Sequence, residues 1–223
     1  MARASPENSS LTAGAGLLIT GREAPAAQFL CTHGAGAGMQ TAFLETIAAL
    51  LTEREIRTLR FEFAYMAARR EGGSRKPPPK AERLVDEYRA AVASVPKGAP
   101  LLIGGKSMGG RVASMIAGDL FTRGQVAGLV CLGYPFHPPK KPDQLRTAHL
   151  ENLDCPALII QGERDPFGTR AEVEAMQLSS AIRFHWADDG DHDLGPRGSS
   201  GFTRRGNLAS AADRIAEFAR SLA

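Results

Sequence analysis

Short, continuously apolar runs separated by longer amphipathic stretches limit this chain to a few folds. The apolar runs cover residues 27–34, 56–63, 100–105, 126–135, 156–165 and 182–188. The stretches with apolar residues at helical spacing cover residues 39–54, 81–95, 108–120, 171–177 and 209–223. Strands that are apolar on both faces and alternate with helices are typical of a parallel sheet covered on both sides. The pattern therefore predicts an α/β fold with a mostly parallel central sheet and helices on both faces.

The length and composition favour one domain. The chain has 223 residues, of which 43% are hydrophobic, and this is enough for one α/β domain with a substantial core. No internal repeat and no linker divides it, so we expect a single domain over residues 1–223. The net charge of +3 is mild, and the chain lacks the dense basic stripe of nucleic-acid-binding proteins. The basic segment 67–80 is interpreted first as a solvated loop.

The cysteines and the N-terminal segment bear on where the protein resides. Cys31, Cys131 and Cys155 lie in or beside apolar runs, and no C-x-x-C spacing indicates a disulfide framework or a zinc site. Buried free thiols are typical of proteins in a reducing compartment. Residues 1–21 hold only a short apolar patch interrupted by glycine, and no run approaches transmembrane length. These features favour a cytoplasmic protein that does not bind membranes.

The segment LLIGGKSMGGR, residues 101–111, matches two motifs in part. A phosphate-binding P-loop needs glycine five residues before Gly105, but that position holds Pro100, and the residues between them resemble a buried strand. A nucleophile elbow needs a strand, a tight G-x-S-x-G turn and a helix that starts at once. Residues 105–109 satisfy this pattern, so the elbow interpretation is preferred and Ser107 becomes the candidate nucleophile.

A serine hydroxyl attacks a carbonyl only when a base accepts its proton and a third group orients that base. In folds with this elbow, the chain order is serine, then an acid, then histidine. Asp165 stands at the end of the apolar run 156–165 and His192 follows the next run, 182–188, so both arrive in the right order at strand ends. Glu163 competes with Asp165 on the same turn. The competing histidines break the order or fall within a strand: His137, His149 and His185.

The acidic residues around the candidate base need a separate interpretation. Asp188, Asp189, Asp191 and Asp193 crowd His192, and their spacing does not match a calcium-binding loop. We interpret them as a solvated acidic loop, and we expect no metal and no cofactor.

The segment CTHGAGAGM, residues 31–39, follows a predicted strand and opens a predicted helix. It resembles the glycine-rich loop whose backbone N–H completes an oxyanion hole with the N–H after the nucleophile. We assign these donors to Ala35 and Met108, with Gly36 as the alternative to Ala35, and we expect His33 to stabilise the loop. The same glycines, with Glu62, imitate a dinucleotide-binding fingerprint, but the third glycine is missing.

With these residues assembled, the chain resembles the α/β-hydrolase superfamily over essentially its whole length. The closest likeness is to small, lidless, dienelactone-hydrolase-like proteins. The strings GGKSMGGR, LGYPFHPP and QGERDPFGT together resemble a group that includes the hydrolase-like domain of a regulatory subunit of the non-specific-lethal histone-acetyltransferase complex. The resemblance implies a nucleophile at Ser107, an acid at Asp165 and a base at His192. A dienelactone hydrolase proper is expected to use cysteine, whereas this elbow has serine.

The segment between the predicted strands 126–135 and 156–165 is too short for a multi-helix cap, so we expect an open and shallow site. The sequence therefore predicts a serine hydrolase that cleaves a small ester or thioester through an acyl-enzyme. The alternative is a non-catalytic interaction protein with the same fold, since some relatives serve as interaction modules. We expect a small-molecule partner and no nucleic acid, and a protein partner is left open.

Overall fold

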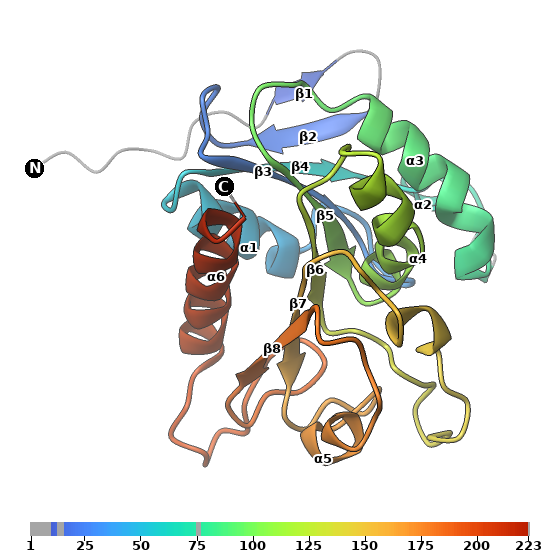
Figure 1. The fold of residues 1–223 in the computed structure, drawn as a ribbon, viewed down its shortest axis with the longest axis vertical. Helices are drawn as coiled ribbons and strands as arrows, with labels where there is room; N and C mark the ends of the chain where they lie inside the picture. Colours follow the sequence, from blue (N-terminus) through green and yellow to red (C-terminus); the bar gives the residue numbers. More distant parts are fainter. Residues whose placement is uncertain (1–9, 13–15, 75–76, 223) are drawn as a thin grey trace, which may run out of the picture.

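A central sheet carries the fold of the computed structural model, which describes residues 10–12, 16–74 and 77–222 (Figure 1). Within these residues the sheet has eight strands in the order β1-β2-β4-β3-β5-β6-β7-β8. The strands are β1 (Ser10–Thr12), β2 (Leu17–Thr20), β3 (Ala27–Thr32), β4 (Ile56–Phe61), β5 (Leu101–Lys106), β6 (Gly128–Leu132), β7 (Ala157–Gly162) and β8 (Ile182–Ala187). Strands β3 to β8 are parallel, whereas β2 pairs antiparallel with both β1 and β4.

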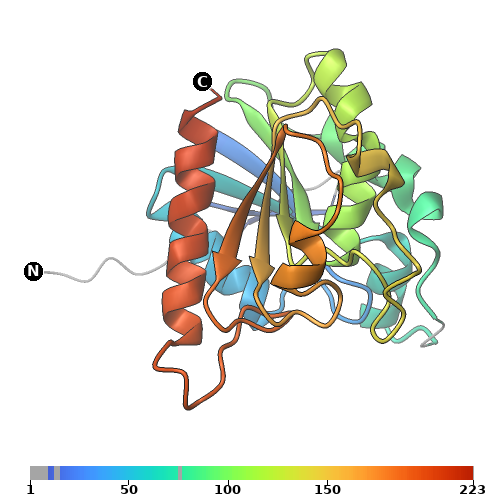
Figure 2. The same cartoon turned by 60° about the horizontal axis from the view of Figure 1, so that its bottom comes forward.

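Helices cover both faces of the sheet (Figures 1 and 2). They are α1 (Ala42–Thr52), α2 (Ala64–Arg70), α3 (Val85–Ala93), α4 (Met108–Thr122), α5 (Arg170–Glu174) and α6 (Arg204–Arg220), with 3-10 turns η1 (Ala81–Leu84) and η2 (Ala148–Leu150). Helices α1 and α6 pack side by side on one face, where one apolar cluster lies, and α3 and α4 bury a second cluster on the other. The predicted fold class is confirmed.

Helix α1 illustrates why these segments fold as they do. Its N-terminus is capped by Thr41, whose hydroxyl accepts a hydrogen bond from the Leu44 N–H at 3.4 Å. Its apolar residues recur at helical spacing and are buried: Phe43, Leu44, Ile47, Ala48 and Leu51. Strands β3, β5 and β7 in the middle of the sheet are buried along their whole length, as a sheet with helices on both faces requires.

Three elements differ from the sequence expectation. The antiparallel pair β1 and β2 was not predicted, because glycines interrupt the short apolar patch there. Residues 64–70 form helix α2, although most of this segment was interpreted as a solvated loop. Helix α6 begins at Arg204 rather than at Ala209, with the Thr203 hydroxyl accepting from the Gly206 N–H as its cap. Helix α2 has only seven residues, too few for hydrophobic periodicity to show, and helix α6 starts in polar sequence, where periodicity gives no signal.

The connection between β6 and β7 carries only the 3-10 turn η2, so no separate cap domain covers this edge of the sheet. The three cysteines are buried and unpaired, and burial raises the pKa of the Cys31 thiol to about 12. Such thiols are unreactive at neutral pH. No helix in the described part of the chain is long and apolar enough to cross a membrane.

Candidate active site

The turn between β5 and α4 holds Ser107 in an unusual backbone conformation. Strand β5 ends at Lys106, Ser107 has φ 51° and ψ −115°, and α4 starts at Met108. A residue other than glycine in such a sparsely populated region costs on the order of 1–3 kcal/mol and persists only where its surroundings fix it. Here the Ser107 N–H donates to the Leu132 carbonyl and the Ser107 carbonyl accepts from the Arg111 N–H, both at 3.0 Å. The strain is a property of the predicted elbow.

Glycines around Ser107 allow the turn to pack against its neighbours. A Cβ at Gly109 would lie 2.7 Å from the His33 carbonyl oxygen, and one at Gly110 would lie 2.8 Å from the Gly105 carbonyl oxygen. Both distances are shorter than real Cβ contacts, and the obstacles are backbone atoms that cannot move aside. The G-x-S-x-G spacing is therefore required by close backbone packing, as the elbow interpretation supposes.

Asp165 and His192 form a hydrogen-bonded pair at the carboxyl end of the sheet. The Nδ1 atom of His192 lies 2.8 Å from Oδ2 of Asp165, whose side chain is fully buried. The same carboxylate accepts from Gln161 Nε2 at 3.0 Å and from the Phe167 N–H at 2.9 Å. Because the carboxylate accepts, Nδ1 of His192 is the donor, and Nε2 is left with the lone pair. The imidazole is thereby oriented and set in the tautomer that can accept a proton.

Ser107 and His192 both lie at the carboxyl end of the sheet. Strands β5, β7 and β8 are parallel, and the turns that carry Ser107, Asp165 and His192 leave their carboxyl ends; the arrowheads of β7 and β8 point to this edge in Figure 2. Lys106, the residue before Ser107, donates from Nζ to the His192 carbonyl oxygen at 2.7 Å. The three sequence-predicted residues therefore gather at one end of the sheet, where ligand sites of such folds lie.

The loop after β3 is held beside Ser107 by buried hydrogen bonds. A Cβ at Gly34 would lie 3.6 Å from Ser107 Cβ. His33 is fully buried, and its Nε2 accepts from the Phe63 N–H at 3.2 Å, so its Nδ1 donates to the Gly34 carbonyl at 2.7 Å. In a trans peptide the N–H points opposite to the C=O, so the Ala35 N–H points away from His33. Tyr65 fixes the next peptide by donating from its hydroxyl to the Ala35 carbonyl at 3.1 Å.

His33 is thus a loop-stabilising residue, as expected from the sequence. Burial lowers its pKa below the usual histidine value, which keeps the imidazole neutral and preserves this pair of hydrogen bonds at neutral pH. Its Nε2 is occupied by a backbone N–H, so it has no free lone pair with which to accept a proton from a substrate or nucleophile.

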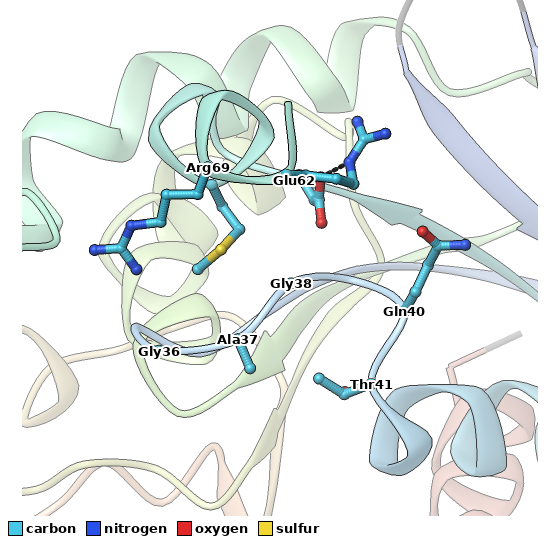
Figure 3. Close-up of a pocket in the computed structure, with 9 residues that line it drawn as sticks. Gly36, Ala37, Gly38, Gln40, Thr41, Glu62 and Arg69 are labelled. Atoms are coloured by element: carbon cyan, nitrogen blue, oxygen red, sulfur yellow. Dashed lines mark hydrogen bonds and ion pairs between the residues drawn. The ribbon is translucent and has the colours of Figure 1, made fainter. Parts of the chain in front are cut away.

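A cavity of about 440 Å³ lies next to this loop (Figure 3). It is lined by Gly36, Ala37, Gly38, Gln40, Thr41, Glu62, Met66, Arg69 and Arg70. Both carboxylate oxygens of Glu62 are engaged: Oε1 accepts from the Met39 N–H at 3.1 Å and Oε2 from Arg70 Nε at 2.9 Å. Glu62 thus fixes the loop to α2, which argues against the role of a ribose ligand that the dinucleotide-binding alternative would give it.

Of the acidic residues around His192, Asp188, Asp191 and Asp193 are exposed, as expected for a solvated loop, whereas Asp189 is a buried anchor and departs from that interpretation. Asp189 is buried and accepts from Arg197 through its backbone N–H at 2.7 Å and its Nη2 at 2.6 Å. These hydrogen bonds lower the pKa of Asp189 to about 2, so it is ionised at neutral pH. Asp191 accepts from the N–H groups of Asp193 and Gly195. The sequence shows the charges but not these partners, which come from within the same loop.

Asn207 of α6 also anchors this loop and was missed in the sequence. Its side-chain Nδ2 donates to the carbonyl oxygens of Asp188 at 3.0 Å and Leu194 at 2.9 Å, on either side of His192. Only its polar character within an otherwise apolar helix face could have singled it out, because Asn207 is buried.

The remaining histidines have partners of their own. His149 Nε2 lies 2.8 Å from Ser114 Oγ, and His185 Nε2 lies 3.1 Å from Ser210 Oγ. His137 is buried, with Nε2 3.6 Å from Glu172. Among the described residues, no group of three or more His, Cys, Asp or Glu side chains could hold a metal ion.

Comparison with known proteins assigns the chain to a family. The model of the alpha/beta hydrolase domain family matches residues 25–220, so the chain belongs to that family. Its fold is similar to that of an alpha-beta serine hydrolase homologue from Coxiella burnetii, with 21% identity, a TM-score of 0.64, and 93% of this chain and 91% of that chain covered. It is similar to dienelactone hydrolase from Anabaena variabilis, with 18% identity, a TM-score of 0.69, and 98% and 97% covered.

A third solved structure, a serine hydrolase without lid from Xanthomonas campestris, has 18% identity, a TM-score of 0.58, and 89% of both chains covered. The predicted likeness to small, lidless, dienelactone-hydrolase-like proteins is confirmed. The narrower likeness to the subunit of the non-specific-lethal complex stays a prediction.

Proposed function

We propose that the protein is a serine hydrolase that cleaves a small ester or thioester by way of an acyl-enzyme. The observation that carries this proposal is the strained Ser107 elbow at the same edge of the sheet as the hydrogen-bonded Asp165–His192 pair. A strained residue and a buried carboxylate paired with histidine are both costly to maintain, and they occur together where nucleophilic catalysis needs them. Membership of the alpha/beta hydrolase domain family supports the same reaction class.

In the proposed reaction, Ser107 Oγ attacks the carbonyl carbon while His192 Nε2 accepts its proton. Asp165 holds the imidazole through Nδ1 and stabilises the imidazolium that forms. The N–H groups of Ala35 and Met108 stabilise the negative oxygen of the tetrahedral intermediate, with the positive end of α4 beneath it. The imidazolium then protonates the departing alcohol or thiol, and water activated by the same histidine cleaves the acyl-enzyme.

The substrate class follows from the open edge of the sheet. No cap domain covers the site, so a long acyl chain would find little apolar wall, and small acyl groups are favoured. Two of the similar structures are esterases by name: Est1E from Butyrivibrio proteoclasticus, described with bound ferulic acid, and an esterase domain from Rhodothermus marinus. We therefore propose short esters and thioesters as the first substrates to screen.

The proposal is tested by the mass of the intact protein after treatment with a fluorophosphonate probe. A single adduct, located on Ser107 by peptide mapping, is expected because only an activated serine reacts quickly with such probes. Heat-unfolded protein serves as the control for non-specific labelling. Absence of the adduct on folded protein would contradict the proposal and favour the alternative, a non-catalytic interaction protein of the same fold.

Removing the buried imidazole of His33 should weaken oxyanion binding. In His33→Ala the Gly34 carbonyl loses its donor, so the Ala35 N–H is no longer held in place. Loss of one oxyanion donor typically lowers kcat by about 10²–10³. Steady-state kinetics with a short ester should show this loss mainly in kcat. Tyr65→Phe, which frees only the Ala35 carbonyl, should lose less, and an equal or larger loss there would contradict this placement of the donor.

If the basic segment near the site attracts acidic substrates, their kcat/KM should fall as the salt concentration rises. Arg69 and Arg70 line the cavity beside the loop that holds Ala35. Attraction between exposed charges is screened within about 8 Å at physiological ionic strength. Raising NaCl should therefore lower kcat/KM for a carboxylate-bearing ester more than for its neutral methyl ester. An identical salt response of the two substrates would indicate that the arginines serve the structure alone.

A further inference from the structure

The side chain of Lys106 joins the elbow to the loop that carries His192. It is nearly buried, with 10% of the side chain exposed. Its Nζ donates to the His192 carbonyl oxygen at 2.7 Å, lies 3.3 Å from Oδ1 of Asp193, and sits over the Phe43 ring, 5.4 Å from the centroid. One ammonium group therefore contacts two segments: the β8–α6 loop through two acceptors, and α1 through an aromatic face. Burying an ammonium is costly, so these contacts need an explanation.

Gly133, at the end of β6, leaves the space through which Lys106 reaches the loop. A Cβ at this position would lie 2.8 Å from the His192 carbonyl oxygen, 3.1 Å from Lys106 Nζ and 3.3 Å from His192 Nδ1. Its φ of 66° also favours glycine. Lys106 Nζ and His192 Nδ1 both lie close to the position of this Cβ, so they are within about 6.5 Å of each other. This is near the range in which two charges alter each other's ionisation.

We propose that Lys106 is a positioning residue for His192, because its ammonium group fixes the histidine loop against the elbow and places a positive charge near the imidazole. The proposal rests on the proposed hydrolase function and deepens it, because it assigns to the residue before the nucleophile a role in setting the pH range of the reaction. Neither the G-x-S-x-G motif nor the family match assigns this residue a role.

The charges around His192 decide the direction of the effect. Asp165 is the carboxylate that contacts His192, and Asp191 and Asp193 are the further negative groups whose charges act on Lys106, the positive group near the imidazole. Burial lowers the pKa of Lys106 below the usual lysine value, whereas these three carboxylates raise it in turn, Asp193 most. Two acceptors stabilise the charged form of Lys106: the His192 carbonyl oxygen at 2.7 Å and Oδ1 of Asp193 at 3.3 Å.

The test measures the rate at which a fluorophosphonate probe labels Ser107 between pH 5 and pH 9. In Lys106→Met the positive charge is gone and the imidazolium persists to higher pH, so the acidic midpoint of the rate–pH profile should rise by about 0.5–1 pH unit. The plateau rate should also fall, by about tenfold, because the loop loses an anchor. Lys106→Arg, which keeps the charge and the donors, should restore the midpoint.

Two control variants separate charge from structural support. Asp193→Asn removes a negative charge, so the midpoint of its rate–pH profile should move downward, opposite to that of Lys106→Met. Because Asp193 is more exposed, the change should be a few tenths of a pH unit, about half that of Lys106→Met or less. Asn207→Ala removes two uncharged anchors of the same loop, so it should lower the plateau rate and leave the midpoint in place. Melting temperatures show whether each variant is folded. If Lys106→Met does not fold, the midpoint of Asp193→Asn still decides the test.

The outcomes distinguish this proposal from the hydrolase proposal. An unchanged midpoint in Lys106→Met and Asp193→Asn, or an equal midpoint change in Asn207→Ala, would overturn the role of Lys106 while labelling of the parent still supports an activated serine. If the parent is not labelled at all, the hydrolase proposal fails. The titration of the His192 imidazole by NMR, assigned by comparison with His192→Gln, then gives the midpoints, with the same directions expected.

Discussion

Replacing Ser107 with alanine is expected to lower kcat for a short ester by about 10⁴–10⁶ while the fold is retained. The loss is large because the attacking group itself is removed, and water at the site must react without an acyl-enzyme. Alanine occupies less space than serine and keeps the backbone N–H and C=O bonds to Leu132 and Arg111, so the elbow should persist. Initial rates at saturating ester, measured with protein free of host esterases, give the ratio.

Ser107→Gly provides a matched control for this prediction. It lacks the hydroxyl as well and should be equally inactive, but glycine relieves the strain of a positive φ. We therefore expect it to melt at a higher temperature than Ser107→Ala. Turnover by either variant at the rate of the parent would show that another residue is the nucleophile.

The second large effect is expected for Asp165→Asn, with a loss of about 10³–10⁴ in kcat. A neutral amide can neither stabilise the imidazolium nor enforce the Nδ1–H tautomer as the carboxylate does. The variant should also be less stable, because the three groups that donate to the carboxylate come from different directions. Whichever way the amide turns, its NH₂ group faces the N–H of either Gln161 or Phe167. An unmet buried donor costs about 1–3 kcal/mol, which a denaturation curve measures.

Glu163→Gln is the control, since Glu163 was the competing acid on the same turn. Its side chain pairs with Arg170 and accepts from the Asp189 N–H, and an amide oxygen can replace the second of these contacts. We expect its kcat to stay within about threefold of the parent, in the range of surface substitutions. A loss as large as that of Asp165→Asn would transfer the role of the acid to Glu163.

Much of the fold could be predicted because strand and helix periods differ along the chain. Strands β3, β5, β6 and β7 are short and buried along their whole length, and the helices that cover the sheet, such as α4, carry apolar residues at helical spacing. The pair β1 and β2 could not be predicted, since an edge pair draws its order from β4, a strand far away in sequence. Helix α2 is tied to the loop after β3 through Glu62, which accepts from Arg70 of the helix and from the Met39 N–H of the loop. The local sequence does not show this contact.

The candidate site divides in the same way. Ser107, Asp165 and His192 could be proposed from motif and order, because parallel strands bring their carboxyl ends to one edge. The anchors could not. Lys106 was considered only as part of a P-loop, and its partner His192 lies 86 positions along the chain. The pairing of Asp189 with Arg197 and of Asn207 with two loop carbonyls depends on how the loop after β8 closes. These contacts are set by tertiary structure.

The strand order has a consequence for how the protein is made. Strand β5, which leads into the proposed nucleophile Ser107, lies between β3 and β6, all three synthesised early, whereas β7 and β8 are added later at one edge of the sheet. Chains grow from the N-terminus at about 5–20 residues per second, and the first parts begin to fold before the last emerge. On the ribosome, the elbow can therefore form while the acid and the base are still absent. If the proposed triad is correct, a chain that stops before His192 would carry an inert serine, and reactivity of Ser107 would report that the β8–α6 loop has been added to the fold.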